Sequence, residues 1–192
     1  GSVGAALTGN VTVSDGTNQC VAAVSTGQCN ITFTTAGSKS LTATYAGDVN
    51  YNGSASSPAA SHTVNPANTT TSITNAASLN ATPSVTGQSV IVQWSIAVSS
   101  PGSLGVSLTG NVTVSAGSDN CVAAVSAGQC SIIFSTAGAK SITAQYSGDA
   151  NYNGSTSGSA AHTVNAANTT TTITNAASLN STPSVTGAGV VV

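Results

Sequence analysis

The sequence has almost no charge. Only 3% of its 192 residues are Asp, Glu, Lys or Arg, and the formal net charge is -2. An ordinary soluble domain has about a quarter of its residues charged. Because no basic cluster is present, nothing predicts binding to nucleic acid or attraction to an anionic membrane surface. The four acidic residues are all Asp and are spread along the chain, so no carboxylate pair is available for acid–base catalysis.

Other absences narrow the function further. No stretch approaches about 18 consecutive apolar residues, so membrane insertion is not expected. No helical or heptad period is sustained, which predicts that helices are almost absent. The sequence also contains no G-x-S-x-G nucleophile motif. We therefore expect a protein that is not an enzyme and that binds no cofactor.

The sequence has instead a long internal repeat. Three motifs that occur twice are LTGNVTVS (from Leu7 and Leu108), Y-x-G-D-x-N-Y-N-G-S (from Tyr45 and Tyr146) and HTVN (from His62 and His162). The first two recur after 101 residues, and the third recurs after 100 because one residue is deleted in the second copy. A period near 100 is too long for a solenoid repeat but matches one β-sandwich domain.

This period divides the chain into three parts. Residues 1–65 correspond to the C-terminal part of a preceding repeat, residues 66–165 to a complete repeat, and residues 166–192 to the N-terminal strands of a following repeat. Gly1-Ser2 also matches Gly102-Ser103 in this alignment. Two interpretations remain open. The chain is a window of a longer tandem array, or it is a subunit whose tail completes the head of its neighbour.

Alternating apolar and polar residues predict strands separated by turns. The longest such stretch is SVIVQWSIAV, residues 89–98, in which Trp94 and the apolar residues at even positions share one face. About seven such stretches occur in the complete repeat, spaced roughly as in an immunoglobulin-like (Ig-like) sandwich. The predicted fold is all-β, with tandem Ig-like β-sandwich repeats of about 100 residues each.

The motif order also carries a family resemblance. The stretch Y-x-G-D-x-N-Y follows a strand of the type h-x-x-T-A-x-Y at Tyr45–Asp48 and again at Tyr146–Asp149. In this respect the chain resembles the bacterial Ig-like repeats found in tandem in surface proteins, over essentially its whole length. The resemblance implies an Ig-like fold, an extracellular or cell-surface location, and a role as stalk, spacer, adhesin or filament.

The four cysteines form two similar pairs. Cys20 and Cys29, like Cys121 and Cys130, have eight residues between them. If each pair lies on the two arms of a hairpin, the sulfurs fall opposite each other and suit a disulfide. For so short a loop we expect a contribution of about 2.5–3 kcal/mol per bridge. Zinc binding and redox catalysis fit poorly, because no C-x-x-C spacing is present. Structural disulfides in turn imply an oxidising compartment.

Two loops carry alternating oxygen donors that form a weak Ca²⁺ candidate: Asp48, Asn50 and Asn52, and likewise Asp149, Asn151 and Asn153. Calcium takes six to eight oxygens and usually several carboxylates, whereas each loop has one Asp. Gly, Asp and Asn also shape turns through bonds to the local backbone. We favour the turn interpretation and expect no metal.

The sequence context of the histidines and of two tyrosines indicates structural roles. His62 and His162 lie in a terminal strand without a neighbouring carboxylate or cysteine cluster, so a packed or edge histidine is expected. Tyr45 and Tyr146 stand at a strand end before Gly-Asp, a position like that of a tyrosine corner. Neither type of residue indicates a catalytic site.

Three functions compete, and a structural one fits best. We expect a non-catalytic repeat segment of a bacterial extracellular filament, stalk or adhesin shaft, which self-associates head-to-tail into fibres by strand complementation. The alternatives are an adhesion module that binds glycan or a host protein, and a spacer domain of a secreted enzyme. Recognition of glycan or protein calls for exposed aromatics or a charged patch, which the repeats lack. No nucleic-acid partner is expected, and contact with a glycan or other surface stays open.

Overall fold

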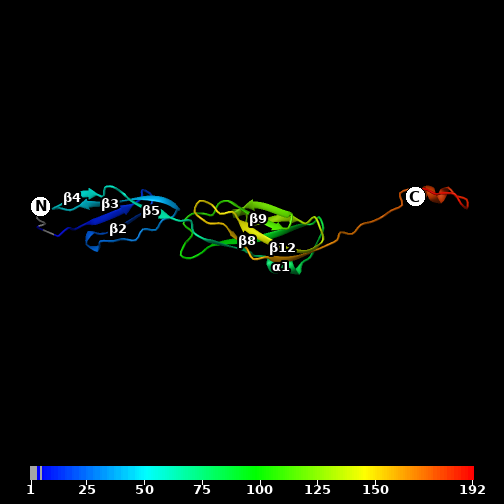
Figure 1. The fold of residues 1–192 in the computed structure, drawn as a ribbon, viewed down its shortest axis with the longest axis horizontal. Coiled ribbons are helices and arrows are strands. Elements are labelled where there is room, and N and C mark those ends of the chain that lie inside the picture. The colour runs from blue at the N-terminus through cyan, green and yellow to red at the C-terminus, as the bar shows by residue number, and fades with distance from the viewer. Residues whose placement is uncertain (1–3, 5) are drawn as a thin grey trace.

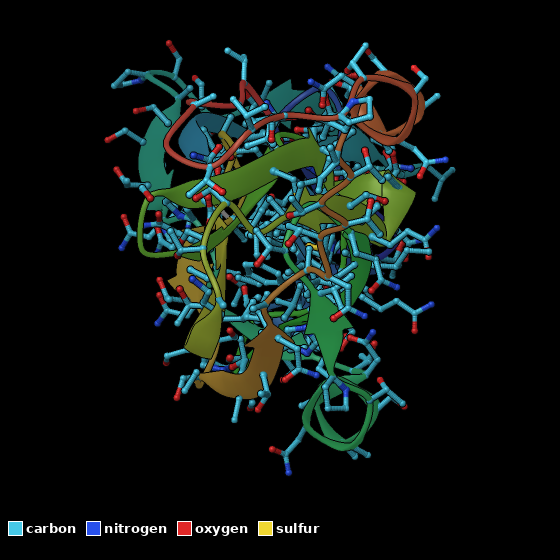
Figure 2. The ribbon with its side chains drawn as sticks, turned by 90° about the vertical axis from the view of Figure 1, so that its right-hand side faces the viewer. Carbon is cyan, nitrogen blue, oxygen red and sulfur yellow. A yellow bond between two sulfur atoms is a disulfide. The ribbon has the colours of Figure 1, made fainter. Side chains whose placement is uncertain are left out.

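The protein is elongated, with three parts in line. The computed structural model describes residue 4 and residues 6–192, so Gly1-Ser2 and their match to Gly102-Ser103 lie outside the described residues. A first β-sheet unit, a larger sandwich and an extended terminal segment follow one another along one axis (Figure 1). Viewed down that axis, polar side chains point outward around a narrow molecule (Figure 2).

Residues 67–165, called the central sandwich here, form two stacked sheets. The larger sheet has the order β10-β9-β12-β14-β7, with β13 paired to β12, and the smaller has the order β11-β8-β6. All pairs are antiparallel except β14 with β7. The strands are β6 (Thr69–Ile73), β7 (Ser84–Val85), β8 (Ser89–Val98), β9 (Asn111–Ala116), β10 (Asp119–Ala124), β11 (Gln129–Ile133), β12 (Gly138–Tyr146), β13 (Ser155–Thr156) and β14 (Ala160–Asn165).

The core lies between these sheets and follows the predicted alternation. Along β8, Val92 and Trp94 are buried while Ile91 and Gln93 are exposed. They pack against apolar residues that are 0–1% exposed and lie on the other strands or, for Phe134, directly after β11: Val112, Val114, Ile132, Phe134, Ile142, Ala144 and Tyr146. Full burial of a Val, Ile or Phe side chain stabilises the fold by about 1.5–3 kcal/mol. The all-β sandwich predicted from the sequence is confirmed.

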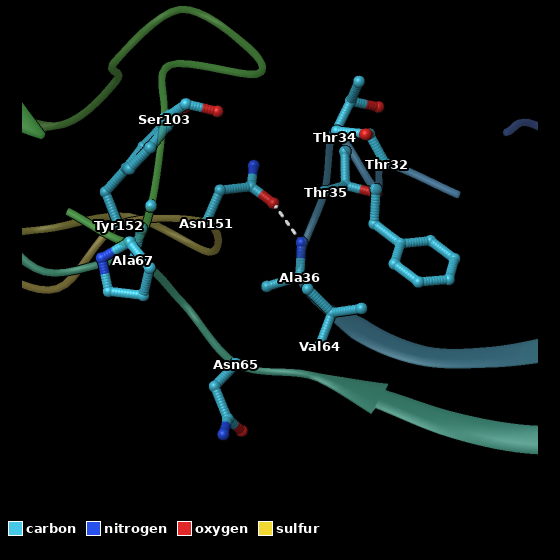
Figure 3. A pocket seen from close by; sticks show the side chains of 13 residues that line it. Thr32, Thr34, Thr35, Ala36, Val64, Asn65, Ala67, Ser103, Asn151 and Tyr152 are labelled. Atoms are coloured by element: carbon cyan, nitrogen blue, oxygen red, sulfur yellow. Dashed lines mark hydrogen bonds between the residues drawn. The ribbon is translucent and has the colours of Figure 1, made fainter. Parts of the chain in front are cut away.

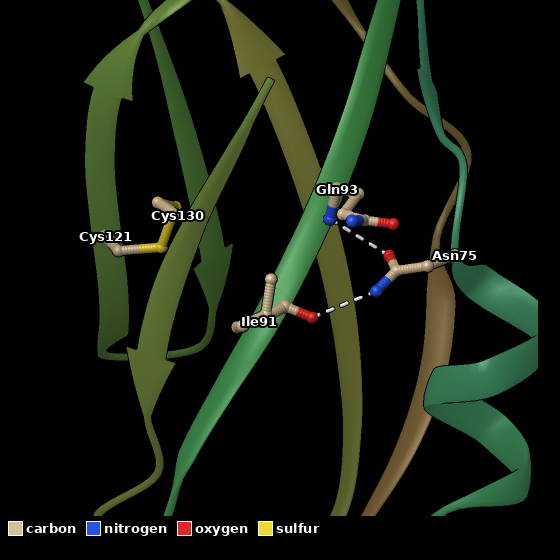
Figure 4. The surroundings of a disulfide bond; sticks show 5 residues. All are labelled: Asn75, Ile91, Gln93, Cys121 and Cys130. Atoms are coloured by element: carbon tan, nitrogen blue, oxygen red, sulfur yellow. Dashed lines mark hydrogen bonds between the residues drawn. A yellow bond between two sulfur atoms is a disulfide. The ribbon is translucent and has the colours of Figure 1, made fainter. Parts of the chain in front are cut away.

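The segment from Cys121 to Cys130 departs from the prediction. It is not a hairpin, because β10 pairs with β9 and β11 pairs with β8. A 3-10 turn, η2 (Val125–Ala127), ends at Gly128, whose φ of 67° suits glycine, and takes the chain from the larger sheet to the smaller. The Cys121–Cys130 disulfide therefore joins the two sheets (Figure 4).

A short helix was also not predicted. Helix α1 (Ala76–Ala81) packs beside β14 and buries Leu79. Before it, the Asn75 side chain donates to Ile91 O and accepts from Gln93 N, both at 3.0 Å, which ties the helix start to β8 (Figure 4). No helix in the described part of the chain is long and apolar enough to span a membrane.

Residues 6–65 form the counterpart of the larger sheet, called the head sheet here. Its order is β2-β1-β3-β4, with β5 paired to β3. Its strands are β1 (Asn10–Ser14), β2 (Gln19–Ala23), β3 (Gly37–Gly47), β4 (Asn52–Ala55) and β5 (Ala60–Val64), and η1 (Val24–Thr26) follows β2. Residues 28–32, which correspond to β11, form no strand, because no counterpart of β8 lies beside them in the described chain.

Residues 166–173 are extended, helix α2 (Ala176–Ser181) follows, and the chain then folds back so that Asn175 Nδ2 donates to Val191 O at 2.8 Å. The strands predicted in this segment are absent from the structure. Strands need neighbours to pair their backbone groups, and no sheet lies beside this segment in the single chain. Residues 169–192 are called the tail segment below.

Candidate functional site

One face of the head sheet carries core residues without a covering sheet. Val11 and Val13 of β1 correspond to Val112 and Val114 of β9, which are 0% exposed in the central sandwich. Val11 and Val13 are half-buried instead. The head sheet therefore presents an apolar face of the kind that monomeric proteins usually cover.

This uncovered face contains a hollow of about 200 Å³. It is lined mainly by small apolar side chains, among them Val11, Val13, Ala22, Val24 and Ala43. In the central sandwich, Trp94 occupies the corresponding place, because its Nε1 donates to Val125 O at 3.4 Å and Val125 is the counterpart of Val24. The hollow thus lies where a strand equivalent to β8 would place its large side chain.

In the central sandwich a buried histidine hydrogen-bonds to the segment between β6 and β8, which covers the larger sheet. His162 is 2% exposed, with Nε2 at 2.8 Å from Ser84 Oγ and Nδ1 at 2.8 Å from Leu79 O. Both partners belong to the segment between β6 and β8. The head counterpart, His62, is exposed and stacks on Phe33, with no hydrogen-bond partner for its ring in the described chain. The head sheet therefore has this histidine but not the segment that it binds.

The tail segment repeats the sequence that covers the larger sheet in the central sandwich. Residues 169–192 match residues 69–92 at 19 of 24 positions. The five differences are Ser72/Thr172, Ala81/Ser181, Gln88/Ala188, Ser89/Gly189 and Ile91/Val191. Leu179 and Ser184 are thus the counterparts of Leu79 and Ser84.

The Asp-Asn loops are held by hydrogen bonds within the protein. Asp149 Oδ2 accepts from Thr109 N at 2.8 Å, and Oδ1 accepts from Asn151 N at 2.8 Å and from Tyr152 N at 3.0 Å. Asp48 makes the corresponding bonds in the head sheet. Because both carboxylate oxygens have protein donors, the geometry favours the turn interpretation over Ca²⁺. Within the described residues, no group of three His, Cys, Asp or Glu side chains is placed to hold a metal.

A tyrosine hydroxyl reinforces each loop. Tyr146 OH donates to Thr109 O at 2.8 Å, as Tyr45 OH does to Thr8 O. Burial, with the charge of Asp149 nearby, raises the pKa of Tyr146 to about 12. Burial also acts to raise the pKa of Asp149, but hydrogen bonds from Thr109 and Asn151 outweigh it and hold that pKa below its usual value.

These carboxylates predict acid sensitivity. A lowered pKa in the folded state means that the ionised Asp149 stabilises the fold above about pH 4, and that this stability is lost as the pH falls further. We expect the midpoint of denaturant unfolding, followed by Trp94 fluorescence, to fall between pH 4 and pH 2. The Asp149→Asn variant should be less stable at pH 7 and should depend less on pH in this range. If the unfolding midpoint of the variant falls with pH as steeply as that of the wild type, this role of Asp149 is contradicted.

The two stacked sheets, the bridged cysteine pairs and the tyrosine-supported loops define an Ig-like β-sandwich protein. The family model of the bacterial Ig-like domain (group 3) matches residues 1–65 and 76–165, so the chain belongs to this family. The resemblance inferred from the Y-x-G-D-x-N-Y motif is thereby confirmed. Comparisons with curated proteins and with solved structures found no match.

Proposed function

We propose that the chain is a non-catalytic structural segment of a bacterial extracellular filament, stalk or adhesin shaft. In this proposal the tail segment of one copy, which matches β6, α1, β7 and the first residues of β8, covers the corresponding part of the uncovered face of the head sheet of the next. The observation that carries it is that the head sheet lacks the cover that the same sequence provides in the central sandwich. Family membership and two disulfides, which form in oxidising compartments, support an extracellular location.

The central sandwich supplies the register for this contact. There Ser84 of β7 pairs in parallel with Val164 of β14. The same register places Ser184 of one copy opposite Val64 of the next, with its Leu179 beside the exposed His62. The contact joins unlike surfaces and does not close on itself, so it generates a thread rather than a dimer.

The energetic gain comes from apolar side chains that are poorly packed in the single chain. Leu179 is half-buried and Val192 is 81% exposed. Their counterparts Leu79 and Val92 are 3% and 0% exposed. Full burial of each such side chain contributes about 1.5–3 kcal/mol, and backbone hydrogen bonds to a sheet edge add to this. These gains oppose the entropy cost of association.

Self-association of the full chain tests this function. We expect sedimentation velocity to show species that grow with concentration, and electron micrographs to show unbranched threads. Because a ten-residue strand spans about 33 Å, each hundred residues should add about 35–40 Å to the thread. Isolated monomers at every concentration up to about 1 mM would overturn the proposal, since such a contact is expected to be far tighter than that.

A further inference from the structure

The connection between the head sheet and the central sandwich is a bonded joint. The linker that follows β5 lies beside the loop that contains Asn151. Ala67 N donates to Asn151 O at 2.9 Å, and Asn153 N donates to Ala67 O at 2.8 Å, which forms a parallel bridge between Ala67 and Tyr152. The linker is therefore held as a short strand against this loop.

The Asn151 side chain extends the joint to the head sheet itself. Its Oδ1 accepts from Ala36 N at 2.8 Å, a bond between residues 115 positions apart (Figure 3). Ala36 lies in the turn just before β3, at the end of the head sheet that faces the central sandwich. An asparagine of the loop first considered for Ca²⁺ is thus a direct tie between two consecutive units.

Close packing at the joint also depends on a glycine. A Cβ atom on Gly105 would lie 2.6 Å from Thr34 O, so a side chain at this position would displace the head turn. The counterpart of Gly105 is Gly4, which has no atom within 4 Å of the corresponding position. The space beside Gly4 is therefore open, whereas the corresponding space beside Gly105 is filled by the head turn.

The two halves of this joint recur, unpaired, at the two ends of the described chain. Asn50, the counterpart of Asn151, is exposed, and its side-chain amide has no hydrogen-bond partner among the described residues. Ala137, the counterpart of Ala36, is exposed at the far end of the central sandwich, and no acceptor for its N–H is found in the described chain. One end thus offers the acceptor and the other end offers the donor.

We propose that Asn50 Oδ1 of one copy accepts a hydrogen bond from Ala137 N of a second copy, and that the Asn50–Asn52 loop pairs with Ala167 of that second copy. The inference rests on the proposed function, because the tail segment that covers a head sheet brings its own linker beside this loop. The joint between copies then reproduces the joint within the chain, so the angle between units is the same throughout a thread.

Amide hydrogen exchange of the full chain, read by NMR after dissociation, tests this joint. In the dilute monomer we expect the Ala36 amide to be protected and the Ala137 amide to exchange freely. In assembled wild-type protein, Ala137 should gain protection. In the Asn50→Ala variant, Ala137 should stay unprotected, and self-association should weaken by about threefold to tenfold, the effect of one net hydrogen bond.

Two control variants separate the joint from general effects. Asn151→Ala should remove the protection of Ala36 in the monomer, and Ser131→Ala, an exposed substitution in the central sandwich away from the joint, should change neither amide. If wild-type chains assemble while Ala137 stays unprotected, or if Asn50→Ala assembles as tightly as the wild type, the joint is overturned and the proposed function stands. If wild-type chains do not assemble, both are overturned.

Discussion

Replacing both Cys121 and Cys130 by alanine is expected to lower the free energy of unfolding of the central sandwich by about 2.5–3 kcal/mol. The bridge closes a loop with a sequence separation of 9, and its loss frees that loop in the unfolded chain. The bridge also joins β10 of the larger sheet to β11 of the smaller, which pair with other strands rather than with each other. Trp94 is the single tryptophan and lies in the core, so its fluorescence during denaturant unfolding reports on this sandwich.

The repeat supplies a matched control for this prediction. Cys20 and Cys29 form the same bridge in the head sheet, where no second sheet is present in the described residues. The double variant Cys20→Ala/Cys29→Ala should therefore leave the unfolding midpoint of the Trp94 signal near that of the wild type. If both double variants shift the midpoint equally, the Trp94 signal does not report on the unfolding of the central sandwich alone.

Much of the central sandwich follows from local sequence pattern. The alternation in residues 89–98 predicted the bounds of β8 and the inward position of Trp94, because side chains of a strand point to opposite faces in turn. The position of Tyr146 before Gly-Asp likewise predicted a structural tyrosine like that of a tyrosine corner, and its hydroxyl donates to Thr109 O. The alternation of β8 depends on residues close together in the chain, whereas the acceptor of Tyr146 lies 37 residues earlier.

The features that sequence reasoning missed depend on distant partners. The spacing of Cys121 and Cys130 predicted that they face each other, but it carries no information on which strand each arm pairs with, so the hairpin was wrong. Helix α1 has six residues, too few for a helical period to show. Asn151, part of the weak Ca²⁺ candidate, ties two units because its Oδ1 accepts a hydrogen bond from Ala36 N, 115 residues away. No local sequence signal marks a contact between residues so far apart.

The same reasoning explains the tail segment. Thr169 to Ile173 has nearly the sequence of β6, yet it forms no strand in the single chain. A strand is stabilised by its neighbours more than by its own propensity. The state of the tail segment is therefore set by what lies beside it, and a substitution that blocks its docking should be visible in assembly but not in the monomer.

Leu179→Asp is expected to weaken head-to-tail assembly by at least about a hundredfold at pH 8. Its counterpart Leu79 is 3% exposed, so docking would bury a carboxylate among apolar side chains at a cost of several kcal/mol. Sedimentation velocity over a concentration series measures the loss, and the unfolding of the central sandwich, followed by Trp94, should be unchanged.

Val185→Asp is the matched control, because it introduces the same charge six residues away in the same segment. Val85, its counterpart, stays 42% exposed in the central sandwich, so a charge at position 185 remains in water after docking. This variant should assemble nearly as the wild type does. If Leu179→Asp also assembles like the wild type, the tail segment does not occupy the head sheet in the register of the central sandwich. If Val185→Asp blocks assembly equally, charge alone governs association and the apolar face of the head sheet is not the docking surface.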